Sequence, residues 1–496
     1  MMENDGMSLV TSDPAAAPPA HCDIVFRHGT VIDGSGTPGI RADVAVDGGK
    51  IVAVGDLAAT RAEWDIDAGN RVIAPGFIDV HTHDDRAMLS GPDMAPKVSQ
   101  GVTTVVVGNC GFSLAPLTCH GRPPAPLDLL GDETWFVYDS FGDYLDRLEA
   151  KPAAVNAVCL VGHMTLRVGA MDDLDRSATE DEIALMGERL EQSLDAGAAG
   201  LSTGLHYPAG HAASTEEVIA LTRRLANNRG LYVTHMRNEA DDVEKSLVET
   251  FRIGRETGVP VLISHHKVIG PANFGRSVQT LARIEQAMTE QDVSLDLYPY
   301  TAGSTVLDPG RCDGRMRVLV TWSVPFPEQT GRDIADIAAD WHCPPVEAAK
   351  RLLPAGAIYF MLDEGDVQRI LHNPHTMIGS DGLPHDSHPH PRLWGTFPRV
   401  LGHYARDLGL LSLEEAVHRM TGLPAGRFGL SERGAIRPGY VADMVMFDPL
   451  RVIDRSTYED PTVPADGIDL VLVDGTPVWQ QGKTTGARPG HVLRRG

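Results

Sequence analysis

The feature that most constrains the fold of this 496-residue chain is an alternation between short apolar runs and helical segments, from about residue 76 to residue 424. Within each run the apolar residues are continuous rather than alternating, which is typical of parallel strands covered on both faces. The eight runs are 76–81, 102–109, 156–161, 200–203, 231–235, 260–265, 293–298 and 376–381. Eight strands with helices between them predict an α/β fold, a (β/α)8 barrel of the TIM type.

Three of the predicted helices begin with a capping-box sequence, in which a Ser or Thr is followed three residues later by Glu. The pairs are Thr179 with Glu182, Ser214 with Glu217, and Ser412 with Glu415. After Thr179, apolar residues recur at helical spacing and predict one face that packs against the sheet.

The two ends of the chain have a different pattern, with short strands joined by Gly/Asp turns at 23–34, 42–55, 71–76, 434–448 and 469–483. Each of these segments is too short to bury a core alone. We therefore expect one small β-sandwich domain from residues 23–75 plus 425–496, with a catalytic barrel, 76–424, inserted between them. Residues 1–22 are acidic and proline-rich and lack the basic start and apolar run of a secretory signal, so they predict a disordered extension.

A longer stretch, 301–375, separates the seventh and eighth predicted strands. It is richer in Pro, Gly and Arg than a plain crossover needs, and long insertions between barrel strands are often lids. A lid-like insertion is expected here, and a peripheral helical decoration is the alternative.

Charge and cysteine usage exclude several classes of partner. The net charge is −24, which would repel nucleic acid and anionic membranes, and no apolar stretch reaches the ~20 residues of a membrane span. The six cysteines are scattered without CxxC pairs, which indicates reduced thiols in a cytoplasmic protein rather than a disulfide framework.

The strongest local signal is APGFIDVHTHDD (74–85), in which an apolar run ends in His81 and His83. Alternate residues of a strand point to the same side, so both imidazoles can reach one metal ion. The carboxyl end of a barrel strand is also where active sites lie. The pair therefore predicts a metal centre at the end of the first strand.

Three further metal-binding groups lie at the ends of predicted strands. They are His235 on the fifth strand, His265 on the sixth and Asp381 on the eighth. A single histidine among the 20 in the chain would mean little, but four strands that each bring such a group to the same rim indicate zinc or a similar divalent ion.

The chain resembles the amidohydrolase superfamily and, within it, the N-acyl-D-amino-acid deacylases, or D-aminoacylases. The motifs that carry the resemblance are HTHDD (81–85), PDMAPKVSQGVTTVVVGNCG (92–111), STGLHYPAG (202–210), THMRNE (234–239), ISHHKVIG (263–270), DLYPYTAGST (296–305) and GSDGLPH (379–385). The resemblance covers nearly the whole chain. It implies zinc-dependent hydrolysis of an N-acyl-D-amino acid to a D-amino acid and a carboxylic acid.

The resemblance also gives a role to Cys110. Many superfamily members bridge two metals with a carbamylated lysine on the fourth strand, but this fourth strand, GLSTGLHY (200–207), has no lysine. In D-aminoacylases a cysteine after the second strand takes that place, and a metal-bound thiol supplies the missing negative charge. The resemblance implies one or two zinc ions: a tighter site with Cys110, His235 and His265, and a weaker one with His81, His83 and Asp381.

The remaining roles are also implied by the resemblance. Asp381 would act as the general base and then protonate the leaving amine. His206 or Tyr207 could stabilise the oxyanion, and the family uses the tyrosine. The α-carboxylate of the substrate would bind the side chains of Lys267, Tyr298 and Ser304. Arg86 and Arg237 could bind an acidic substrate side chain or could simply pair with neighbouring carboxylates.

Two other functions remain open from the sequence. A cyclic-amide hydrolase of the dihydropyrimidinase or dihydroorotase kind shares the HxH motif but normally needs the fourth-strand lysine. A metal-free scaffold relative would have lost ligands, whereas all six candidates are present here. The expected partner is a small-molecule substrate. Its side chain and acyl group, and the oligomeric state of the chain, are not determined by these motifs.

Overall fold

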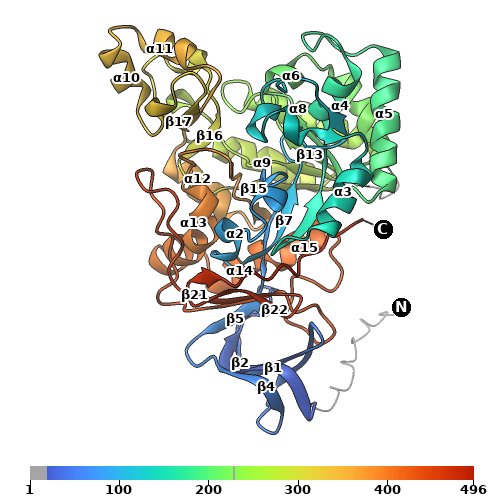
Figure 1. Ribbon diagram of the computed structural model, residues 1–496, viewed down its shortest axis with the longest axis vertical. Helices are drawn as coiled ribbons and strands as arrows, with labels where there is room; N and C mark the ends of the chain where they lie inside the picture. The colour runs from blue at the N-terminus through green and yellow to red at the C-terminus, as the bar shows by residue number, and fades with distance from the viewer. Residues whose placement is uncertain (1–18, 227–229, 496) are drawn as a thin grey trace, which may run out of the picture.

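A computed structural model describes residues 19–226 and 230–495, and helices and parallel strands alternate through most of the chain (Figure 1). The predicted α/β class is confirmed. Among the described residues, none of the helices combines the length and the apolar character needed to cross a membrane.

Each of the eight predicted apolar runs contains a strand. One parallel sheet has the order β10-β7-β6, and a second has the order β11-β12-β13-β14-β15-β19. These strands are β6 (Phe77–Asp79), β7 (Val102–Val107), β10 (Asn156–Cys159), β11 (Val161–Gly162), β12 (Gly200–Gly204), β13 (Leu231–His235), β14 (Val261–Ile263), β15 (Val293–Leu297) and β19 (Thr376–Ile378). Several are shorter than predicted, because the chain turns before the candidate ligands at 81, 265 and 381.

The two parallel sheets meet at both ends. Only Leu160 separates β10 from β11, and at the other end Thr82 pairs with Gly382 in a parallel bridge. A buried apolar cluster takes residues from all around this arrangement. They include Ile78, Val106, Val158, Leu231, Val233, Leu262 and Met377. The carboxyl ends of the first and last strands therefore lie side by side.

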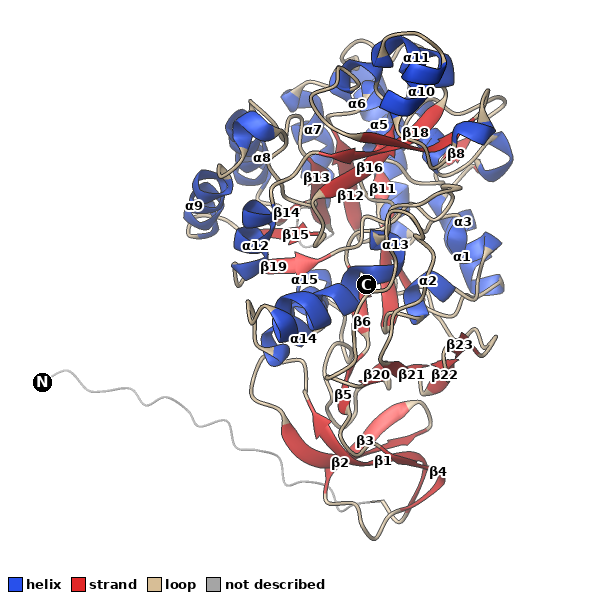
Figure 2. Ribbon diagram, turned by 90° about the vertical axis from the view of Figure 1, so that its left-hand side faces the viewer, coloured by secondary structure: helices blue, strands red, loops and turns tan. Residues whose placement is uncertain are grey.

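Helices cover the outer side of these strands (Figure 2). They are α1 (Ala87–Ser90), α2 (Ala95–Val98), α3 (Phe141–Ala150), α4 (His163–Ala170), α5 (Glu180–Asp195), α6 (Pro208–His211), α7 (Thr215–Thr222), α8 (Val243–Thr257), α9 (Ser277–Met288), α12 (Glu364–His372), α13 (Arg392–Arg399), α14 (Leu413–Met420) and α15 (Gly422–Phe428). Of the three predicted capping boxes, those at the starts of α5 and α14 are complete. At α7 the box is half formed, because the Glu217 carboxylate instead binds His163 and Arg167 in the interior.

Strands from both ends of the chain pair in a single sheet at the lower end of Figure 2. Its order is β23-β22-β21-β20-β5-β1-β2-β3, with β4 paired to β1. The strands are β1 (His21–Val31), β2 (Ile40–Asp47), β3 (Lys50–Gly55), β4 (Arg61–Asp67), β5 (Val72–Pro75), β20 (Met444–Phe447), β21 (Ile468–Val473), β22 (Thr476–Gln480) and β23 (Lys483–Thr484). Because β1 begins at His21, the last two residues of the predicted extension 1–22 belong to this sheet, while residues 1–18 lie outside the described residues.

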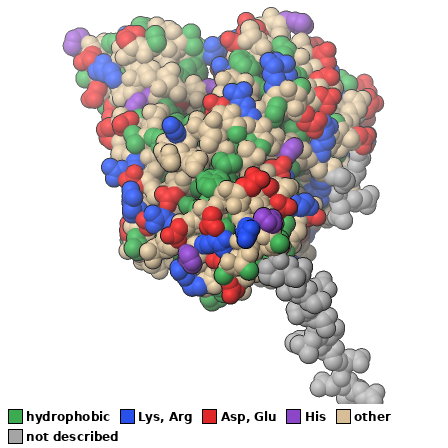
Figure 3. Space-filling view, turned by 60° about the horizontal axis from the view of Figure 1, so that its bottom comes forward, with side chains coloured by type: hydrophobic (Ala, Val, Ile, Leu, Met, Phe, Trp, Pro, Cys, Tyr) green, Lys and Arg blue, Asp and Glu red, His purple; other side chains and the backbone are tan. Residues whose placement is uncertain are grey.

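The surface toward this end of the molecule carries charges of both signs. On the face shown in Figure 3, Asp and Glu side chains are interspersed with Lys and Arg, and neither sign forms a continuous surface there. That face therefore offers no extended basic track of the kind that binds nucleic acid.

The stretch 301–375 divides into two parts. Residues 302–360, here called the insertion lobe, contain an antiparallel sheet of β16 (Ala302–Val306), β18 (Ala355–Phe360) and β17 (Val318–Ser323), with α10 (Ile334–Asp340) and α11 (Pro345–Leu352). The lobe has its own apolar core and projects at the upper left of Figure 1. Helix α12 instead packs on α9, β15 and β19, as a crossover helix does. A two-stranded sheet, β8 (Leu117–Thr118) with β9 (Val137–Tyr138), lies elsewhere in the loops.

Candidate metal centre

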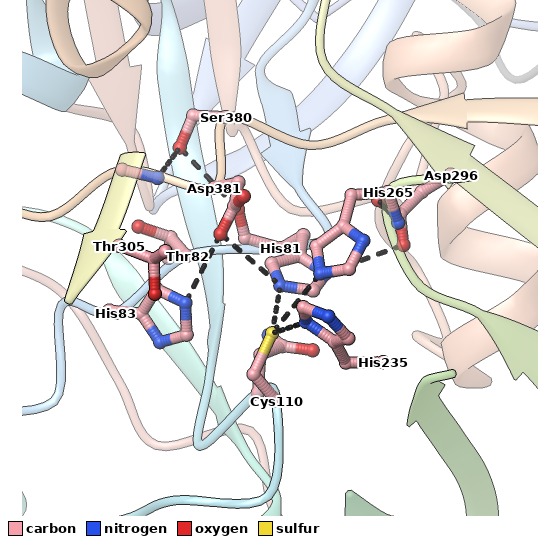
Figure 4. A network of polar contacts seen from close by, with 12 residues as sticks. His81, Thr82, His83, Cys110, His235, His265, Asp296, Thr305, Ser380 and Asp381 are labelled. Atoms are coloured by element: carbon pink, nitrogen blue, oxygen red, sulfur yellow. Dashed lines mark hydrogen bonds and ion pairs between the residues drawn. The ribbon is translucent and has the colours of Figure 1, made fainter. Parts of the chain in front are cut away.

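The six predicted metal ligands come together in one buried cluster (Figure 4). They are His81 and His83 after β6, Cys110 after β7, His235 at the end of β13, His265 after β14 and Asp381 after β19. Each is no more than 8% exposed. The convergence follows from the parallel pairing, which brings the carboxyl ends of these strands to one edge.

The ligand atoms form two groups that share one thiol. One group is His81, His83, Cys110 and Asp381, and the other is Cys110, His235 and His265. The Cys110 Sγ lies 3.2 Å from His81 Nε2, 3.3 Å from His265 Nε2 and 3.6 Å from His235 Nδ1. With Zn–N bonds of about 2.0–2.1 Å and Zn–S bonds of about 2.3 Å, the ligands of a tetrahedral zinc lie about 3.3–3.7 Å apart. The spacing of the donors therefore fits zinc.

Three of these ligands have an unusual backbone conformation. Cys110, His265 and Asp381 have φ values of 52°, 35° and 49°, in the left-handed region that non-glycine residues rarely adopt. Such conformations cost free energy and cluster at functional sites. Here they turn each side chain inward just beyond its strand.

Two glycines allow the chain around Cys110 to pack closely. A Cβ at Gly108 would lie 2.1 Å from the carbonyl oxygen of Leu160, and a Cβ at Gly111 would lie 2.5 Å from the backbone nitrogen of Gly204. Any larger residue at either position would therefore force the backbone on one side of Cys110 to shift.

Neighbouring charges and burial shift the pKa values of the thiol and the imidazoles in the cluster. Burial by itself would raise the pKa of the Cys110 thiol, but His81 and His265 hold that pKa well below its usual value. Burial lowers the pKa of His235 to about 4, so that its ring is neutral and has a lone pair to offer. Burial would also lower the pKa of His265, but the charges of Cys110 and Glu239 raise it to about 9. Imidazoles bind metal in the neutral form, so a metal ion here would displace that proton.

A buried carboxylate that the sequence reasoning missed lies behind two of the histidines. Glu239 is 3.2 Å from His265 Nδ1 and 3.4 Å from His235 Nε2, and it accepts a hydrogen bond of 2.8 Å from Lys267 Nζ. A carboxylate on the outer nitrogen of a ligand histidine fixes its tautomer and orientation. The only signal in the sequence is that Glu239 lies four residues after His235 in THMRNE.

A buried lysine, also missed, lies beneath the other ligands. Lys97 Nζ donates to Asp79 (2.7 Å), to the Thr82 hydroxyl (2.9 Å) and to the Ser380 hydroxyl (2.8 Å), and it is fully buried. Thr82 lies between His81 and His83, and Ser380 precedes Asp381. Lys97 thus ties the first ligand-bearing segment to the last.

The four predicted substrate-binding residues line one small pocket together with Asp381. They are Tyr207, Lys267, Tyr298 and Ser304, and the pocket measures about 30 Å³. The chain does not continue as an extended strand from His265 to Lys267, because His265 has a positive φ. The side chain of Lys267 nevertheless turns back to the ligand, and its Nζ lies 2.7 Å from His265 Nδ1.

Arg392 is a further charged residue of this pocket that the sequence did not reveal. Its side chain is 1% exposed, its Nη1 lies 2.9 Å from Asp381 Oδ2, and its guanidinium carbon lies 4.5 Å from the centre of the Tyr298 ring. Burial would raise the pKa of Asp381, but Arg392 and His83 hold it well below its usual value. Asp381 is therefore ionised.

His206 and Tyr207, the two candidates for the oxyanion contact, differ in how free their polar groups are to bind an oxyanion. His206 Nε2 lies 2.6 Å from Arg311 Nη2, so that its lone pair accepts from that guanidinium. The Tyr207 hydroxyl is 3.1 Å from Thr305 Oγ1, and burial together with the nearby charges of Cys110 and Asp381 keeps its pKa well above the usual value. Tyr207 is therefore a neutral phenol that can donate a hydrogen bond.

The two arginines left open by the sequence lie outside this pocket. Arg237 binds Glu249 with two hydrogen bonds of 2.9 and 2.8 Å and also donates to two backbone carbonyls. It therefore pairs with a neighbouring carboxylate, the alternative to binding a substrate side chain. Arg86 stacks on Trp135 at 4.6 Å and lines a different cavity.

Comparisons with known proteins agree with this geometry. The model of the amidohydrolase family matches residues 66–297 and 328–479. A D-aminoacylase of Alcaligenes xylosoxydans xylosoxydans is 57% identical over 95% of this chain and 98% of its own length. A solved D-aminoacylase structure has a TM-score of 0.94 to this chain at 57% identity, and the match covers 96% of this chain and all of that chain. That structure comes from work on one-metal activation and second-metal attenuation at the binuclear metal centre of the D-aminoacylase.

A second solved structure bears on the ligand chemistry. It is an N-acyl-D-glutamate deacylase from Bordetella bronchiseptica in complex with zinc and a phosphonate that mimics the tetrahedral intermediate. Its TM-score is 0.93 at 47% identity, and 96% of this chain and all of that chain are covered.

Proposed function

The chain belongs to the amidohydrolase family and, within it, to the D-aminoacylases, and on that premise we propose that the buried cluster around Cys110 is its catalytic centre. The protein is a zinc-dependent hydrolase that converts N-acyl-D-amino acids to a D-amino acid and a carboxylic acid. One observation carries the assignment of the site: the Cys110 thiol is shared by both ligand groups, and β12 has no lysine that could take its place.

We propose that the strands of the two parallel sheets form a (β/α)8 barrel, with β10 and β11 as one strand interrupted at Leu160, and that the terminal strands form a small β-sandwich domain. The pairings that link the first strand to the last, and the apolar cluster that draws on all sides, support the barrel. A shared core of residues from β1, β2, β5, β20 and β21 supports one domain built from both ends. The six cysteines are all free, which supports a reducing compartment such as the cytoplasm.

The residues of the cluster fit zinc in number, type and spacing. Zinc held here would lower the pKa of water from about 15.7 toward about 7 and polarise the amide carbonyl. Asp381 starts ionised, so that it can accept the proton of the attacking water and then pass it to the leaving amine. The Tyr207 hydroxyl can donate a hydrogen bond to the oxyanion.

The pocket also explains how a negatively charged protein can hold an anionic substrate. Lys267 and Arg392 both bring positive charge to it, and the Tyr298 hydroxyl is buried without a hydrogen-bond partner among the described residues. In the structure Glu239 and Asp381 compensate the two cations. The α-carboxylate would therefore bind at Tyr298 and Ser304 and draw the two cations toward itself.

The insertion lobe closes this pocket, which supports its role as a lid. At about 30 Å³ the pocket holds about one water, far less than any N-acyl amino acid. Two contacts cross the opening, Tyr207 with Thr305 and His206 with Arg311. An adjoining cavity of about 600 Å³ shares His206 and Arg311, so that outward movement of the lobe would join the two spaces.

The function is tested by a panel of substrates with zinc measured in the same sample. We expect release of the D-amino acid from N-acetyl-D-methionine, -phenylalanine, -glutamate or -aspartate, and far slower release from the L forms. The relative rates of the D compounds define the side-chain preference. Dihydrouracil is the control for a cyclic-amide hydrolase, and its hydrolysis in place of the linear amides would contradict the proposal.

A further inference from the structure

A second polar cavity lies apart from the metal centre. Its volume is about 170 Å³, and none of its lining residues belongs to the pocket around Asp381. Four of its side chains each have a buried polar atom without a hydrogen-bond partner among the described residues: Arg86 Nε, Asp128 Oδ1, His385 Nε2 and Asp386 Oδ2. Asp386 is 8% exposed. Buried polar groups are nearly always paired, so this concentration of free groups indicates a site for a polar ligand.

Arg86 determines the sign of that ligand. Within residues 19–226 and 230–495 the structure gives it no hydrogen bond and no carboxylate within 4 Å, although the chain has 67 acidic residues. Its guanidinium stacks on the Trp135 ring at 4.6 Å, which fixes the plane and leaves its N–H edge free. The other arginine of the cavity, Arg122, is already paired with Asp128 at 2.9 Å.

Three other free groups remain. The charge of Asp128 is paired with Arg122 through its second carboxylate oxygen, and His385 and Asp386 are compatible with an anion. Burial, and then the charge of Arg86, lower the pKa of His385 to about 3, so that the ring is neutral and can donate one N–H. Burial raises the pKa of Asp386 to about 7, which reduces its negative charge at neutral pH. Among the described residues, the acidic and histidine side chains close enough to hold a metal ion are those of the metal centre, not of this cavity.

We propose that this cavity binds a short carboxylate anion, held by the guanidinium of Arg86 and the imidazole of His385. A planar carboxylate matches the fork of a stacked arginine, and about 170 Å³ equals five to six water volumes of about 30 Å³, enough for acetate or a slightly longer acid. The proposed reaction releases such an acid, so that the ligand is either this product or a carboxylate taken from the medium.

The position of the cavity connects it to the substrate pocket. Trp322, on β17 of the insertion lobe, forms part of the wall. Trp322 and Ser304, a residue of the substrate pocket, both lie near enough to Asp386 to influence its pKa. An anion in the cavity would thus act beside the substrate rather than in its place. Inhibition by the acid product should therefore contain a component that substrate cannot relieve.

The test uses sodium acetate as the probe and the zinc-loaded enzyme, with isothermal titration calorimetry and inhibition kinetics at constant ionic strength. Arg86→Gln should raise the acetate Kd at least tenfold and remove the noncompetitive component, while Arg86→Lys and His385→Gln should cause smaller losses. The matched control is Arg351→Gln, since Arg351 also lies over a tryptophan, Trp341, but in the insertion lobe away from the cavity. It should change nothing.

Several results would overturn the proposal. Acetate binding that is unchanged in folded Arg86→Gln and His385→Gln would exclude the site, as would inhibition that is competitive only. Equal binding of chloride and sulfate would show that the cavity senses charge and not a carboxylate. If acetate added to the medium inhibits in this way but the acetate released during turnover does not slow the progress curve, the medium is the source. Normal deacylation in all variants keeps this test separate from that of the proposed function.

Discussion

The two halves of the metal centre are supported in different ways. On one side, His81, His83 and Asp381 rest on Lys97, which touches none of them and instead binds their chain neighbours and Asp79. On this side the Asp296 carboxylate also lies 3.5 Å from the outer ring nitrogen, Nδ1, of His81. On the other side, the carboxylate of Glu239 lies against a ring nitrogen of both histidine ligands of the second group. A carboxylate thus lies behind both histidine ligands of the second group, but behind only one of the two histidines of the first, as far as the described residues show.

This difference bears on which half should hold its ion more tightly. A carboxylate on the outer nitrogen of an imidazole fixes the tautomer and raises the basicity of the nitrogen that faces the metal. In the first half Asp296 can give this support to His81, whereas among the described residues no hydrogen-bond partner is found for the outer nitrogen of His83. The half with His235 and His265 is therefore our proposed tighter position, and Cys110 contributes to both.

The largest effect is expected at the shared ligand. Cys110→Ser should remove zinc from both halves and lower kcat/KM by at least about 10³-fold, because a neutral hydroxyl replaces the anionic ligand. Cys159→Ser is the control, since that thiol is equally buried, and burial raises its pKa. Zinc analysis and kinetics check the result, and a zinc-loaded, active Cys110→Ser enzyme would show that the halves do not depend on the thiol.

The next effect should separate the halves. Asp381→Asn removes the base and one ligand of the first half but leaves the second intact. We expect turnover to fall by about 10³-fold or more while about one zinc per chain remains. Measurement of zinc content and single-turnover rates checks this, and loss of all zinc would mean that the first half is the tighter one.

The sequence predicted the ligands better than their supports. The apolar runs located the strand ends, and strand ends of a parallel sheet converge, so six distant side chains could be placed at one site without coordinates. Lys97 could not be placed, because its partner Ser380 lies 283 residues away in the sequence. Arg392 lies only 11 residues after Asp381, but nothing in the sequence between them indicates that the chain turns back to bring the two side chains together. Whether a charged side chain is buried depends on tertiary packing, and the hydrophobic periodicity of the sequence does not reveal it.

The exact path of the chain at the ligands was also beyond the sequence. The predicted strands run through His81 and His265, whereas β6 and β14 end at Asp79 and Ile263. The left-handed turn at His265 is held by tertiary contacts, including a hydrogen bond of 2.8 Å from its backbone nitrogen to Asp296. Local propensity disfavours such a turn in a non-glycine residue, so that only the assembled fold explains it.

Glu239→Gln should weaken the second half alone. The neutral amide keeps the shape but polarises the two imidazoles less, and loss of such a partner typically costs about 10–100-fold in metal affinity. Chelator competition should show this loss, with activity restored by added zinc. Glu249→Gln is the control, because Glu249 pairs with Arg237 and contacts no ligand. An unchanged zinc affinity would remove the basis for ranking the two halves.

The smallest effect on metal binding is expected from Lys97→Met. The variant leaves Asp79 buried without its cation, so unfolding should become easier by about 3–5 kcal/mol. In the folded enzyme, however, zinc affinity of the second half should stay the same, and that of the first half should fall by no more than about tenfold, since the lysine acts only on position. Lys97→Arg, which keeps the charge, should recover part of the stability. Metal titration below the melting temperature separates the two effects, and an equal loss of zinc from both halves would show that Lys97 and Glu239 support one coupled site rather than two.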